Sequence, residues 1–79
     1  PMNLRLGDYV IAFSTAEIYS CREKEIIFRL TQPRDEMVFE GDVPVRHSED
    51  YDIIREGGRT RLVSKKDGRI NEFLNVGFE

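Results

Sequence analysis

The stretch YDIIREGGRTRLVSKKDGRINEFLNVGF, residues 51–78, decides the fold class that this sequence predicts. Three segments rich in apolar and β-branched residues lie within it, and two pairs of turn residues separate them. The segments are 51–56, 59–65 and 69–78, and the turn pairs are Gly57-Gly58 and Asp67-Gly68. Two-residue loops of these kinds join neighbouring antiparallel strands. The sequence therefore predicts a three-stranded meander over the last third of the chain.

The lengths of the two loops set which residues of this meander face each other. The first loop places Ile53 opposite Leu62, and the second places Leu62 opposite Phe73. With Tyr51, these residues form an apolar patch that can pack on the other strands. The opposite face of the meander carries Arg59, Arg61, Val63 and Lys65. We therefore expect that face to be basic and to point outward.

The first half of the chain predicts further strands. The continuous apolar run at 9–13 is typical of a buried strand. Residues 36–40 can alternate as a strand does, with Met37 and Phe39 on one side. Pro44 then predicts an edge strand or an irregular stretch at 43–45.

Residues 15–31 allow two interpretations. Ser14 and Glu17 can form a capping box, which favours a helix. On a helical wheel, however, Glu23 falls in the middle of the apolar stripe. A hairpin with a charged turn at 22–25 separates apolar from polar side chains better. We therefore expect a hairpin, with a single helix as the alternative.

Together these patterns predict one small all-β domain over residues 1–79. The expected architecture is a barrel or a curved antiparallel sheet of six or seven strands that ends in the meander. The alternative is an α+β fold with one helix at 15–31. A chain of 79 residues buries about 60% of its unfolded surface, which suits a single core and excludes a two-domain enzyme.

The composition, 39% hydrophobic and 34% charged, is typical of a soluble globular domain. No segment approaches the roughly 20 apolar residues of a membrane span, and the start lacks the features of a signal peptide. Cys21 is the single cysteine, so no disulfide can form within the chain. We therefore expect no membrane partner and a location in the reducing cytoplasm.

Charge is distributed unevenly along the chain, whose net charge is −3. Residues 35–52 hold seven carboxylates against one arginine, a local charge of −6, with the histidine neutral. Residues 55–69 hold six basic side chains against two acidic ones, a local charge of +4. The simplest interpretation is that the two segments neutralise each other in the fold.

The acidic segment is the favoured candidate for binding a protein partner, because apolar residues stand there among carboxylates beside an unpaired edge. The candidate residues are Asp35, Glu36, Met37, Phe39, Glu40 and Asp42. In the competing interpretation, Met37 and Phe39 are ordinary core residues and the carboxylates protect an edge strand from aggregation.

The basic segment is the alternative candidate, for a nucleic acid or a phosphate-bearing ligand. The candidate residues are Arg59, Arg61, Lys65, Lys66 and Arg69. Basic side chains repeated along one strand face can follow a phosphate backbone. The aromatic residues that would stack on bases are not interleaved with them, which argues against specific binding of single strands.

Catalytic and metal-binding patterns are weak. His47 stands beside Ser48, Glu49 and Asp50, but hydrolase triads are assembled from distant segments. One histidine and one cysteine do not suffice for a zinc site, and the acidic spacing does not fit a calcium loop. We therefore expect a non-catalytic inhibitor or adaptor without metal or cofactor. The edge near Pro44 also allows a homo-oligomer.

Overall fold

A computed structural model describes residues 4–79 and contains eight β-strands and no helix in that range. The strands are β1 (Leu4–Leu6), β2 (Tyr9–Ser14), β3 (Glu17–Arg22), β4 (Glu25–Arg29), β5 (Glu36–Glu40), β6 (Tyr51–Glu56), β7 (Arg59–Ser64) and β8 (Phe73–Gly77). The all-β prediction is confirmed. The helical alternative at 15–31 is wrong, because β3 and β4 form an antiparallel hairpin there.

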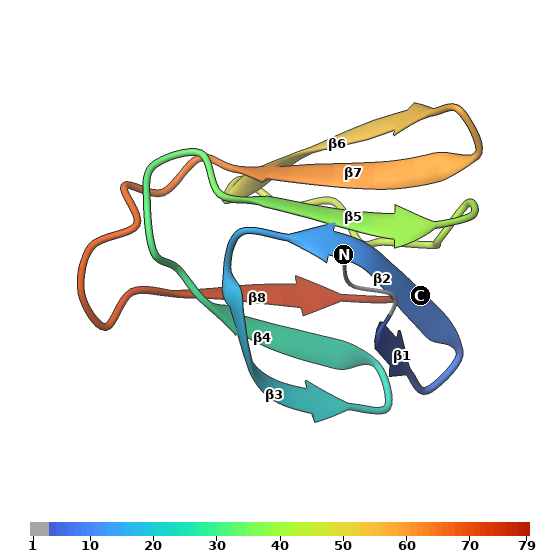
Figure 1. The fold of residues 1–79 in the computed structure, drawn as a ribbon, viewed down its shortest axis with the longest axis horizontal. Coiled ribbons are helices and arrows are strands. Elements are labelled where there is room, and N and C mark those ends of the chain that lie inside the picture. The colour runs from blue at the N-terminus through green and yellow to red at the C-terminus, as the bar shows by residue number, and fades with distance from the viewer. Residues whose placement is uncertain (1–3) are drawn as a thin grey trace.

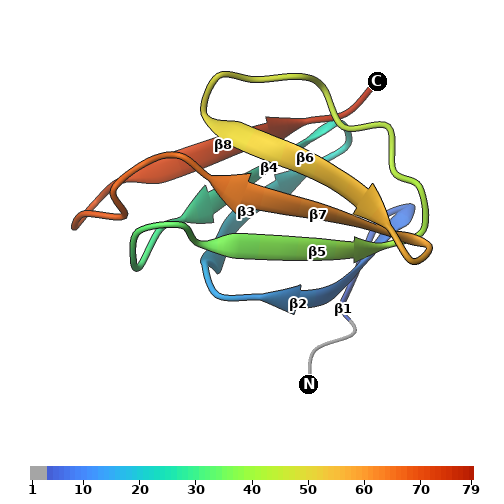
Figure 2. The same ribbon diagram turned by 90° about the horizontal axis from the view of Figure 1, so that it is seen from above.

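The strands form two antiparallel sheets that lie in two layers (Figures 1 and 2). The five-stranded sheet has the order β1-β2-β5-β7-β6, and the three-stranded sheet has the order β3-β4-β8. The prediction of a barrel, or of one curved sheet with six or seven strands, is therefore wrong in this detail. Each sheet keeps two open edges, so the described strands do not close into a barrel.

The predicted meander is half correct. The hairpin of β6 and β7 has the expected register, with Ile53 opposite Leu62. The third strand departs from the prediction, because β8 pairs with β4 and places Phe73 opposite Arg29. On its other side, β7 pairs with β5, so Leu62 lies opposite Met37.

The reason for this departure lies in residues 65–72, which form a crossover between the sheets instead of a tight turn. The backbone of Gly68 lies so close to Gln32 that a Cβ atom at position 68 would be 2.1 Å from the Gln32 carbonyl oxygen. The Glu72 carboxylate accepts hydrogen bonds from the backbone N–H groups of Gly68 (2.8 Å) and Arg69 (3.0 Å). These contacts direct the chain away from β7.

The core fills the space between the two layers. The five-stranded sheet contributes Ile11, Met37, Phe39 and Leu62, and the three-stranded sheet contributes Ile26, Phe28, Leu74 and Val76. All of these side chains are at most 1% exposed. The ring of Phe78 packs edge-on against Phe39, with centroids 5.8 Å apart, and stacks on Tyr9 at 4.5 Å. Burial of each large apolar side chain stabilises the fold by about 1.5–3 kcal/mol.

The chain changes sheet three times, after β2, β4 and β7, and all three crossings lie at one end of the molecule, on the left of Figure 1. Asp35, which is fully buried, connects them. Its carboxylate accepts hydrogen bonds from the Thr15 hydroxyl (2.7 Å), from the Thr31 N–H and hydroxyl (2.8 and 3.1 Å) and from the Gln32 N–H (3.2 Å). Its backbone carbonyl accepts from the Ser64 N–H at 2.8 Å.

Replacing Asp35 with alanine is expected to lower the free energy of unfolding by about 3 kcal/mol, because several partly buried donors lose the fully buried carboxylate that accepts from them. Urea denaturation followed by circular dichroism measures the change. Asp67→Ala is the control: the side chains of Asp67 and Arg69 are 70% and 81% exposed, so losing their ion pair should change stability by less than about 0.5 kcal/mol. Equal losses in the two variants would contradict the role assigned to Asp35.

Candidate functional site

The outward side of the five-stranded sheet carries a row of cross-strand neighbours. Phe13 of β2 lies opposite Val38 of β5, which lies opposite Arg61 of β7, which lies opposite Ile54 of β6. Because Leu62, next to Arg61, is fully buried, Arg61 and its neighbours in this row project away from the core. We call these four residues the outer row. Phe13 is 49% exposed, a large fraction for an aromatic side chain.

Two rows of mostly charged residues flank the outer row. One contains Glu40, Arg59 and Glu56, and the other contains Glu36 and Asp52 on either side of Val63, which is only 4% exposed. With the outer row they make up the surface that we call the outer face. Three of its four carboxylates form ion pairs, Glu40 with Arg59, Glu36 with Arg61 and Asp52 with Lys65, so in the described residues Glu56 is the one that remains without an ion pair. In Figure 2 the viewer looks onto this sheet, and the three-stranded sheet lies behind it.

The outer face is hollowed toward the turn between β6 and β7. The hollow has a volume of about 560 Å³ and is lined by Val38, Glu56, Gly57, Arg59 and Arg61. It therefore holds one apolar side chain, Val38, among the charged side chains of Glu56, Arg59 and Arg61. Such a surface can receive an apolar side chain of another molecule and can form hydrogen bonds around it.

The acidic residues that the sequence singled out do not form one surface. Only Glu36 and Glu40 lie on the outer face, where they pair with Arg61 and Arg59. Asp35 is the buried junction described above. Met37 and Phe39 are fully buried in the core, as the competing interpretation of this segment expected, so they offer no surface for contact.

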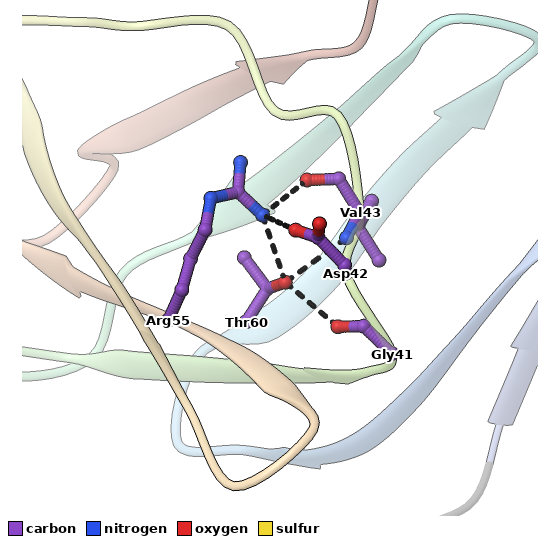
Figure 3. Close-up of polar contacts among 5 residues, drawn as sticks. All are labelled: Gly41, Asp42, Val43, Arg55 and Thr60. Carbon is purple, nitrogen blue, oxygen red and sulfur yellow. Dashed lines mark hydrogen bonds and ion pairs between the residues drawn. The ribbon is translucent and has the colours of Figure 1, made fainter.

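The sixth residue of that set, Asp42, belongs to a structural network (Figure 3). The Arg55 guanidinium donates to the Asp42 carboxylate, to the Val43 carbonyl (2.8 Å) and to the Thr60 hydroxyl (3.2 Å). The same hydroxyl accepts from the Val43 N–H (3.0 Å) and donates to the Gly41 carbonyl (2.8 Å). The network fastens the chain that follows β5 to the hairpin of β6 and β7.

The basic residues of the alternative candidate site each lie against an acceptor. The ion pairs are Arg59–Glu40 (2.8 Å), Arg61–Glu36 (2.9 Å), Lys65–Asp52 (3.3 Å) and Arg69–Asp67 (3.3 Å), and Lys66 donates to the Phe73 carbonyl at 2.7 Å. The hydrogen bond to Glu40 and its negative charge raise the pKa of Arg59. Pairing of β5 with β7 thus brings the acidic and basic segments together, and their charges largely neutralise each other.

Three residues of the outer face were missed from the sequence: Phe13, Val38 and Ile54. Alternation along β5 gave a signal for Val38, because burial of its neighbours Met37 and Phe39 implies that Val38 points outward. Phe13 gave none, since the run at 9–13 is apolar throughout. Its position depends on an irregular register between β2 and β5, at Ile11 and Phe13.

The residues considered for chemistry do not assemble into a site in the described part of the chain. His47 and Cys21 are both exposed. Among residues 4–79, no group of three or more histidine, cysteine, aspartate or glutamate side chains could hold a metal ion. The same residues include no helix with the length and hydropathy that a membrane crossing requires.

The chain matches no protein-family model, no curated protein and no solved structure.

Tyr51 fastens the loop that leads into β6. It is 2% exposed, and its hydroxyl donates to the Arg46 carbonyl at 2.7 Å. Burial raises the pKa of this hydroxyl above its usual value near 10, the nearby Gly77 backbone opposes that shift in part, and the charge of Asp50 adds to it. The folded state therefore favours the protonated phenol.

Tyr51 is expected to make its full contribution to the free energy of unfolding below pH 10. That contribution should fall as the pH rises through the raised pKa of the Tyr51 hydroxyl. Tyr51→Phe should make this alkaline fall shallower and should remove about 1 kcal/mol at neutral pH, the contribution of one hydrogen bond. Denaturation at several pH values tests this. Tyr19→Phe, at a 64% exposed position, is the control and should change the free energy of unfolding at neutral pH by less than about 0.5 kcal/mol.

Proposed function

We propose that this domain is a non-catalytic protein-binding module, of the inhibitor or adaptor type, and that a partner protein docks on its outer face. One observation carries the proposal: Phe13, Val38 and Ile54 lie in a single row with Arg61, on a sheet face that no other strand of residues 4–79 covers, and Phe13 is half exposed. Aromatic anchors at the centre of a contact surface supply much of the binding energy of protein interfaces.

The charges around the outer row indicate which surface charge a partner protein would need. An apolar centre with charged walls matches the usual anatomy of an interface, in which the rim is polar and gives specificity. Because one carboxylate of this rim, Glu56, has no ion pair among residues 4–79 and the net charge of the chain is −3, a partner with a basic rim is favoured. An interface of ordinary size covers about 800 Å² on each partner, roughly a sixth of the 5072 Å² surface.

The nucleic-acid alternative has less support. Phosphate binding draws on free cations, whereas Arg59, Arg61 and Lys65 already pair with carboxylates. A phosphate backbone on this sheet would also meet Glu36, Glu40 and their acidic neighbours. An enzymatic function has no supporting cluster of side chains in the described residues.

The variant that tests the outer face is Val38→Lys, which puts a charge in the middle of the outer row without changing the core. The immobilised domain and its variants are exposed to an extract of the source cells. A protein retained by the unchanged domain is then purified and titrated by calorimetry. We expect Val38→Lys to weaken binding at least tenfold, about 1.4 kcal/mol. Tyr19→Ser, on the exposed side of the three-stranded sheet, should bind normally.

Equal retention and equal affinity for Val38→Lys and Tyr19→Ser would contradict docking on the outer face. Labelled single-stranded and duplex nucleic acids are titrated in parallel at about 50 and about 200 mM salt. Salt-sensitive binding that disappears when Lys65 and Lys66 are both changed to glutamate would favour the alternative instead.

A further inference from the structure

The two sheets have four edge strands, and three of these are protected in ways that natural β-proteins commonly use. Among residues 4–79, β1 spans only three residues. β3 is interrupted by a register shift between Ile18 and Ser20. On β8, the carbonyl of Gly77 accepts from the Arg46 N–H (2.8 Å), and that of Phe73 accepts from the Lys66 ammonium (2.7 Å).

The fourth edge strand, β6, has none of these three features, and its protection is limited to charged side chains: Asp52 and Glu56 on the outer face and Arg55 on the side of the core. Its six residues pair with β7 without any register shift. A hydrogen bond from the Lys65 N–H to the Asp50 carbonyl (2.8 Å) continues this ladder and sets its alternation. The backbone groups of positions 52, 54 and 56 therefore face β7, and those of Tyr51, Ile53 and Arg55 point away from it. Within residues 4–79, no hydrogen bond engages these outward groups.

We propose that this edge pairs with the same edge of a second copy of the chain, antiparallel and around a twofold axis at Ile53. A row of free backbone N–H and C=O groups can be satisfied by a further strand, which pairs with the edge through main-chain hydrogen bonds. Identical strands can satisfy each other symmetrically, and twofold dimers are the commonest oligomers. The proposal does not depend on the docking of a partner protein on the outer face.

The charges of β6 select the register. With the axis at Ile53, that residue faces the partner's Ile53, Tyr51 faces the partner's Arg55, and Asp52 faces the partner's Ile54. Moving the axis to position 52 would place Asp52 opposite the partner's Asp52. Moving it to position 54 would place Asp52 opposite the partner's Glu56. Like charges directly opposite each other destabilise a strand pair. The axis at Ile53 brings such a pair together only at the ends of the ladder, where Glu56 meets the partner's Asp50 outside β6, so this axis is preferred.

The pairing would join two five-stranded sheets into one continuous sheet. The outer rows of the two copies would then lie on the same side of it, with Ile54 at the inner end of each row. A partner that is itself dimeric or repetitive could contact both rows at once. Once such a partner is bound to one outer row, its contact with the second outer row would be intramolecular. This would raise the overall affinity although the side chains of each contact stay the same.

Hydrogen exchange followed by nuclear magnetic resonance tests the pairing on the unaltered protein, together with sedimentation, from about 10 µM to about 1 mM. We expect the mass to double and the amides of Tyr51, Ile53 and Arg55 to slow at least tenfold as the dimer forms. The amides of 52, 54 and 56 face β7 and should be protected throughout. A monomeric mass with fast exchange at Tyr51, Ile53 and Arg55 at every concentration would overturn the proposal.

A cysteine trap tests the register. Ile53→Cys is made in a Cys21→Ser background, and diamide serves as the oxidant. Facing hydrogen-bonded residues have Cα atoms about 5.5 Å apart, a distance that a disulfide spans. We expect a covalent dimer from Ile53→Cys and little from the matched Asp52→Cys. A doubled mass without cross-linking through Ile53→Cys, or preferential cross-linking through Asp52→Cys, would overturn the register.

Discussion

The arrangement of both sheets depends on the buried Asp35 carboxylate and on the backbone around it. Three crossings between the layers meet at this end of the molecule, and Asp35 forms hydrogen bonds to groups in or beside each of them. A buried carboxylate is tolerated only when its oxygens are saturated with donors, and here the hydroxyl and N–H groups of Thr15, Thr31 and Gln32 meet that demand. Because this junction sets β5 between β2 and β7, it also sets the outer row.

The pairing of β5 with β7 explains two properties that looked unrelated in the sequence. It neutralises a strongly acidic segment with a strongly basic one, since Glu40 lies directly opposite Arg59 and Glu36 reaches Arg61. It also leaves Val38 between the charged pairs, on the outward side. Exposed ion pairs of this kind stabilise a fold little, so their main effect is on what the surface can bind.

Local patterns predicted more of this fold than of its assembly. Alternation in 36–40, the glycine pair at 57–58 and the failure of a helical stripe in 15–31 predicted strands that the structure contains. The sheet that β8 joins depends on the contact between Gly68 and Gln32, which are far apart in sequence, and a local turn pattern carries no information about it. The candidate site could not be predicted for the same reason, because Phe13 and Val38 become neighbours only through the pairing of β2 with β5. The apolar pattern that singled out Met37 and Phe39 identified core residues instead of surface residues.

The order of the strands along the chain has a consequence for synthesis. β4 lies in the centre of the three-stranded sheet, yet one of its two neighbours, β8, is the last of the eight strands to leave the ribosome. Until residues 73–77 emerge, β4 presents an open edge, and Ile26 and Phe28 lack the apolar cover of Leu74 and Val76. Nascent chains that meet at this stage can associate through β4, so slow or interrupted translation near the end of this segment favours aggregation over folding.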